Sequence, residues 1–139
     1  MILRKFFRLA ASTSVVGLLV LGLIACGGPS EAERLVNDMQ DAATSVPGVQ
    51  AAQVHVNMNT SGNFITAKLV GASNDEAALS QALKGALPAM LEKTKDLASG
   101  TFSVSIFSPD DAVSVGSDAL GYTGGTSLSD IRDYFLDQP

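Results

Sequence analysis

One cysteine, one histidine and fourteen carboxylates are the side chains whose types could carry chemistry. A hydrolytic triad needs a base that accepts a proton near neutral pH, usually a histidine, next to a nucleophile. His55 has no such serine partner, because the sequence contains no Gly-x-Ser-x-Gly turn. Cys26 and His55 are also too few for a zinc site, which takes three or four ligands. We therefore expect no catalytic residue, no metal and no cofactor, and we place His55 on the polar face of a strand.

The carboxylates show no spacing with a defined role. Two carboxylates can hydrolyse a glycoside, but fourteen acids make some pair inevitable. Asp110 and Asp111 follow Pro109 and are typical of a solvated turn. No loop has the alternating Asp/Asn spacing and the glycine of a calcium site. The acids in 31–41 are expected on the solvated side of a helix.

The residues before Cys26 have the order of an export signal. Arg4, Lys5 and Arg8 precede the uncharged, apolar run 9–25. The basic end of such a signal stays in the cytoplasm while the apolar run enters the membrane. The run is shorter than the ~20 residues of a spanning helix, and no basic stop-transfer cluster follows it.

The run Leu23–Cys26, Leu-Ile-Ala-Cys, resembles the lipobox of bacterial lipoproteins. The resemblance implies cleavage between Ala25 and Cys26 and a diacylglyceryl group on the Cys26 sulfur, with acyl chains such as palmitate. Two acyl chains anchor a protein stably, whereas one binds with only about 10⁴ M⁻¹. The expected location is the outer face of the plasma membrane, or the outer membrane of a Gram-negative cell, because Gly27 is not the Asp of inner-membrane retention.

The sequence divides into a signal peptide (1–25), an acylated cysteine with a short tether (26–29) and a single domain (30–139). Residues 1–25 hold three of the nine basic residues and none of the fourteen acids. The chain from Cys26 therefore carries six basic and fourteen acidic residues, a formal charge of −8. Such a domain is repelled by nucleic acid, so its expected membrane contact is the lipid on Cys26.

The first half of the domain predicts a helix followed by a hairpin. Ser30 has the form of a capping box with Glu33, and the helix should end at Pro47. Period-two alternation predicts strands at 49–58 and 64–70, joined by a polar turn. The residues expected to face inward are Ala52, Val54, Val56, Met58, Ile65, Ala67 and Leu69.

The second half predicts a long helix and a third strand. Ser73 and Glu76 form a second capping box, and the helix should reach about Leu97. Pro88 should kink or split it near 84–87. The run 101–107 alternates, with Phe102, Val104 and Ile106 on one face. Further along, 112–115 is a possible edge strand, 116–125 reads as loop, and Ser127 opens a last helix.

This order predicts an α+β two-layer sandwich, with the helices on one face of a small, mainly antiparallel sheet. A third strand lying between the hairpin strands would make it close to a ferredoxin-like half. The element order over Ala32–Phe107, together with Gly62 and Gly71, resembles the BON domain, an envelope-associated module. That resemblance assigns no functional residue.

Two exposed segments are the candidate contact surfaces. The first is the polar hairpin tip, with Asn57, Asn59 and Asn63. The second is the glycine-rich loop Gly121–Ser127, where Tyr122 could close the core or offer a contact. Such a loop can cradle a phosphate, but it matches no phosphate-binding fingerprint and is more simply a linker that docks the last helix.

Two functions remain open from the sequence. The first is a non-catalytic, lipid-anchored envelope protein that binds a protein or another envelope component. The alternative is a carrier of a small molecule or lipid, held in a pocket between sheet and helices. The aromatic residues that could line that pocket are Phe64, Phe102, Phe107, Tyr122 and Tyr134.

Overall fold

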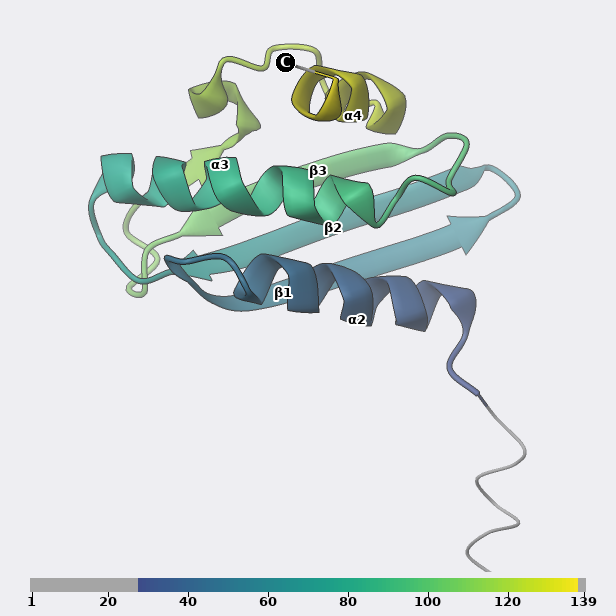
Figure 1. The fold of residues 1–139 in the computed structure, drawn as a ribbon, viewed down its shortest axis with the longest axis horizontal. Helices are drawn as coiled ribbons and strands as arrows, with labels where there is room; N and C mark the ends of the chain where they lie inside the picture. Colours follow the sequence, from purple (N-terminus) through teal and green to yellow (C-terminus); the bar gives the residue numbers. More distant parts are fainter. Residues whose placement is uncertain (1–27, 138–139) are drawn as a thin grey trace, which may run out of the picture. The chain divides into compact units, whose positions relative to one another are not determined.

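Helices α2 and α3 lie on one face of a four-stranded sheet (Figure 1). The computed structural model describes residues 28–137. Their elements are α2 (Glu31–Thr44), β1 (Val49–Asn59), β2 (Gly62–Gly71), α3 (Glu76–Glu92), β3 (Thr101–Phe107), β4 (Ser114–Gly116), the 3₁₀ helix η2 (Ser117–Leu120) and α4 (Leu128–Leu136). The predicted α+β class and helix-strand-strand-helix-strand order are confirmed. The predicted signal peptide and cleavage site, and Cys26 itself, lie outside the described residues.

The predicted hairpin is present as β1 and β2. The two strands pair antiparallel with unbroken register from Ala51 opposite Val70 to Asn59 opposite Gly62. Ile65, Ala67 and Leu69 are buried, as the alternation predicted, because the helices cover that face alone. The opposite face stays open to solvent.

The third strand does not lie between the hairpin strands. The sheet order is β1-β2-β3-β4, and β3 runs parallel to β2 on the side away from β1. Direct hydrogen bonding of β1 to β2 leaves no place between them. Helix α3 provides the crossover that two parallel neighbours require. The condition for a ferredoxin-like half is therefore not met.

Helix α3 differs from its predicted form at both ends and in its middle. Its cap is Asp75, whose carboxylate accepts a hydrogen bond from the Ala78 N–H, while Ser73 accepts one from the Asp75 N–H. The helix ends at Glu92, short of Leu97. Pro88 neither ends nor splits it. Burial of the neighbouring Leu87 and Met90 offsets the ~3 kcal/mol cost of an interior proline.

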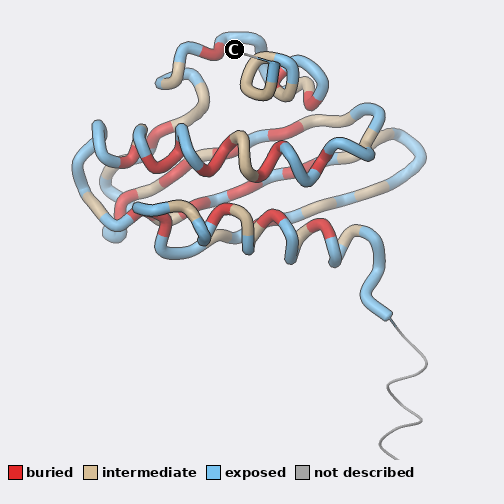
Figure 2. The backbone as a smooth tube through the Cα atoms, in the orientation of Figure 1, coloured by how far each residue is buried: buried red, intermediate tan, exposed pale blue. Residues whose placement is uncertain are grey.

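The core fills the space between the sheet and the helices (Figure 2). Its largest fully buried side chains are Met39, Ile65, Leu69, Leu79, Leu83, Leu87, Met90, Leu91, Phe102, Ile106, Leu128 and Ile131. All of them lie in the compact unit Glu31–Pro139. The core formed by the described residues therefore lies within this unit.

The C-terminal segment docks against β3 and α3. Phe102 donates its backbone N–H to Thr126, and Leu128 donates its own to Gly100. Arg132 donates to the carbonyl oxygens of Thr94 and Leu97, at 2.6 and 3.0 Å. The predicted edge strand falls two residues later, at β4, and the predicted loop contains η2.

Candidate interaction surfaces

The hairpin tip is exposed and uncharged, but its asparagines have different roles. Asn57 and Asn59 are exposed. Asn59 Oδ1 accepts a hydrogen bond from the Ser61 N–H at 2.8 Å, which shapes the turn. Asn63 Nδ2 donates to the Ser99 carbonyl oxygen at 2.8 Å and so ties the tip to the segment before β3. Asn57 and Asn59 therefore remain as candidate contact residues, whereas Asn63 serves the fold.

Helix α2 begins at the same end of the domain as the hairpin tip. Glu31 and Arg34 of its first turn line one hollow together with Met58 of β1 and with Lys93 and Leu97 after α3. Figure 1 shows the start of α2, the β1–β2 turn and the α3–β3 connection at one end. The β2–α3 connection, with Asn74, lies at the opposite end.

Tyr122 does not offer a contact surface. Its side chain is only 5% exposed and packs against the rings of Tyr134 and Phe135, with centroid distances of 5.2 and 5.8 Å. Burial raises the pKa of the Tyr122 phenol, and the charge of Asp130 adds to this. The hydroxyl has no hydrogen-bond partner in the described part of the chain. The contact predicted for Tyr122 is thus wrong, because the ring closes the core under α4.

The loop Gly121–Ser127 is used to attach α4. Ser127 caps the helix by accepting a hydrogen bond from the Asp130 N–H, as predicted. The Leu128 N–H is taken by Gly100. Two amides at the start of α4 are thus engaged within the protein, and Asp130 adds a negative charge there. This arrangement fits a docking linker better than a phosphate cradle.

The open face of the sheet brings together polar side chains from three strands. His55, Thr66 and Ser103 stand in one cross-strand row, and Lys68 lies one row away. Among the described residues, His55 makes no hydrogen bond to the Thr66 or Ser103 hydroxyl. The alternation within each strand predicted polar faces, but the parallel pairing that aligns them could not be read from the sequence.

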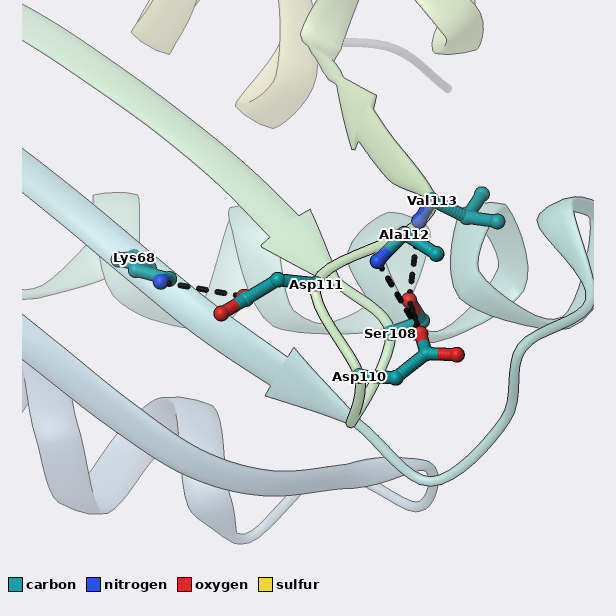
Figure 3. A network of polar contacts seen from close by, with 6 residues as sticks. All are labelled: Lys68, Ser108, Asp110, Asp111, Ala112 and Val113. Carbon is teal, nitrogen blue, oxygen red and sulfur yellow. Dashed lines mark hydrogen bonds and ion pairs between the residues drawn. The ribbon is translucent and has the colours of Figure 1, made fainter.

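Asp110 organises the turn after β3 (Figure 3). Its Oδ1 accepts hydrogen bonds from Ser108 Oγ at 2.6 Å and from the Ala112 N–H at 3.1 Å. Ser108 Oγ in turn accepts one from the Val113 N–H at 3.0 Å. Asp111 forms an exposed ion pair with Lys68 at 3.2 Å. The acids of this turn therefore have structural partners, which agrees with the turn interpretation.

These contacts predict an acid-sensitive turn. The Ser108 hydroxyl, and after it the Ala112 N–H, hold the pKa of Asp110 below its ordinary value of 3.8. A lowered pKa stabilises the fold above pH 3.8, and this contribution is lost as the pH falls through the lowered value. We expect Asp110→Asn to flatten the decline of Tm on acidification in this range. Asp111→Asn is the control, and an equal effect of both variants would contradict the assignment.

The five aromatic residues predicted for a carrier pocket do not share one cavity. Phe102 is buried in the core, whereas Phe64 and Phe107 belong to the opposite, open face. Lys68 Nζ lies 4.6 Å from the centroid of the Phe107 ring on that face. A separate hollow of about 410 Å³ lies between α3, η2 and α4. Its lining residues are Lys84, Pro88, Ala119, Leu120, Tyr134 and Phe135.

Within residues 28–137, no three His, Cys, Asp or Glu side chains are grouped so that they could hold a metal ion. None of the described helices has the length and apolar character needed to cross a membrane. Comparison of the chain with protein-family models, with curated proteins and with solved structures finds no match. The function is therefore argued from the residues themselves.

Proposed function

We propose that this chain is a non-catalytic, lipid-anchored protein of the cell envelope that acts as an interaction module. The observation that carries the proposal is the run Leu23–Cys26, which follows a basic and then an apolar segment and stands just before the folded unit. Two acyl chains on Cys26 would hold the domain at the membrane without a basic surface.

The short tether sets which end of the domain would lie near the membrane. Only 27–30 separate Cys26 from the first residue of α2, and four residues span at most about 14 Å. Since α2 starts at the end that carries the hairpin tip, the tip would be close to the lipid surface. Asn57 and Asn59 would then meet components in or on the membrane. Asn74, at the opposite end, would face away from it.

Photo-crosslinking from the two ends tests this proposal. A photoreactive residue is placed at Asn59 or at Asn74 of the full chain in its own cells. Both asparagines are exposed, Asn59 at the end of β1 and Asn74 in the β2–α3 connection. We expect a protein adduct of defined mass from Asn59 and none from Asn74. No adduct from Asn59, or the same adduct from both positions, would contradict the proposed contact end.

The carrier remains a second candidate because of the hollow between α3, η2 and α4. Its apolar wall and the single cation Lys84 would suit an apolar molecule with an anionic group. Native mass spectrometry of the domain after exposure to envelope lipid extract discriminates the two functions. A discrete adduct that Leu120→Asp removes would support a carrier, whereas a domain free of adducts would exclude it.

A further inference from the structure

Strand β1 is a long, uncharged edge of the sheet. Its only strand neighbour among the described residues is β2. It is 11 residues long and contains no Asp, Glu, Lys, Arg or Pro. Edge strands in natural proteins are usually short, or are protected by charges, proline or bulges. The register irregularity of β1 is confined to its start, between Val49 and Ala51. The rest of the edge keeps an unbroken register with β2. Helix α2 covers one point of it, because Gln40 Oε1 accepts a hydrogen bond from the Val54 N–H, and an added strand must replace that bond.

Backbone groups of β1 point out of the sheet along this edge. The Val54 N–H donates to Gln40 Oε1 on α2 at 3.3 Å, and so points away from β2. In an antiparallel ladder, alternate residues direct their N–H and C=O groups toward the neighbour and away from it. Because the register is unbroken from Ala51 onward, the groups of Ala52, Val56 and Met58 also point outward. Their N–H groups have no partner within the described structure.

Helix α2 leaves a hollow beside the same edge. The hollow measures about 330 Å³, and its lining residues are Ala32, Glu33, Val36, Asn37 and Val56. Val36 and Val56 are only half-buried. The hollow therefore offers apolar surface that an added element could cover.

We propose that β1 pairs antiparallel with β1 of a second copy of this chain, which joins two four-stranded sheets into one of eight strands. An added strand must place apolar side chains beside Val54 and Val56 and polar ones beside Gln53 and His55. β1 has this alternation itself, and a two-fold axis preserves it. No charged side chain of either strand would face another.

A second copy fits this edge better than a lone extended peptide. The apolar side chains of an added strand that face the helix layer must be buried from solvent. In a second copy, its own α2 already packs on that face of β1 and covers them. The two α2 helices would run antiparallel across the axis. Glu31 and Glu33, in the first turn of each helix, would then lie at opposite ends of the interface, so like charges would not meet. The inference is independent of the lipid on Cys26.

Sedimentation equilibrium of residues 28–139 over a concentration series tests the pairing, since the described core lies wholly within the compact unit. We expect a reversible monomer–dimer equilibrium. Gln53→Lys/His55→Lys places like charges across the axis and should weaken the dimer about tenfold or more. Thr66→Lys/Ser103→Lys adds the same charge away from the edge, on the same face, and should leave most of the dimer. A monomer at every concentration, or equal weakening by both pairs, would overturn the proposal.

Amide hydrogen exchange of the unmodified domain gives an independent reading. The outward N–H groups of Ala52, Val56 and Met58 should gain protection as the concentration rises. The His55 N–H, which points toward β2, should be protected throughout and serves as the internal control. Dimerisation without added protection of the outward amides would place the interface elsewhere and refute edge pairing.

Discussion

Replacing Cys26 by serine will leave the protein without a diacylglyceryl group and with residues 1–25 still attached. The thioether needs the cysteine sulfur, and the lipobox resemblance implies that lipid addition precedes cleavage. Intact mass is the required measurement. Membrane fractionation would mislead, because the uncleaved apolar run 9–25 would itself hold the chain to the membrane. A normally cleaved and lipidated product from Cys26→Ser would end the lipoprotein interpretation.

A relocated cysteine provides the matched control. The double variant Cys26→Ser/Ser30→Cys keeps one thiol in the chain but moves it four positions beyond the lipobox. It should behave like Cys26→Ser, because the position after Ala25 matters and not the mere presence of a thiol. Lipid on the relocated Cys would show that the attachment does not depend on the lipobox.

Truncating Phe102 to alanine will cause the largest loss of stability among changes of a single aromatic residue. Phe102 is 1% exposed in the core, and a buried Phe→Ala change costs about 3–5 kcal/mol. Phe64, beside it in the sheet but on the open face, is 42% exposed. We expect Phe64→Ala to cost under about 1 kcal/mol, in line with surface substitutions.

Urea unfolding of the wild type and both variants measures the difference. The free energy of unfolding should fall by several kilocalories per mole for Phe102→Ala alone, with little change in the slope against urea. Equal losses for the two variants would mean that Phe64 is also covered by protein, as another interface on the open face would require. Unchanged stability of Phe102→Ala would contradict the packing of β3 under α3.

Local patterns predicted the elements because neighbouring residues determine them. Alternation of Val54 and Val56 with Gln53 and His55 was enough to identify β1 and its inward face. The cap of α3 was misplaced by two residues because Ser73 and Asp75 are both good capping types, and only the path of the chain after Gly71 decides between them. The order of the strands could not be predicted from the sequence. It depends on which edge of the hairpin the strand after α3 pairs with, and here β3 pairs with β2.

The surfaces were harder to predict than the elements. Asn63 and Tyr122 both looked exposed because they stand in turn or loop sequences. In the structure, Asn63 donates a hydrogen bond to Ser99, and Tyr122 packs between α4 and the core. Both contacts join residues that are distant in sequence. The free edge of β1 was missed for the same reason. Its lack of charge was visible in the sequence, but its place at the border of the sheet was not.

The most direct test of the lipid anchor is mass spectrometry of the N-terminal peptide of the protein isolated from its own cell envelope. The proposal predicts a peptide that begins at Cys26 and carries a diacylglyceryl group on the sulfur. A peptide that begins at Met1, or one with an unmodified Cys26, would contradict it.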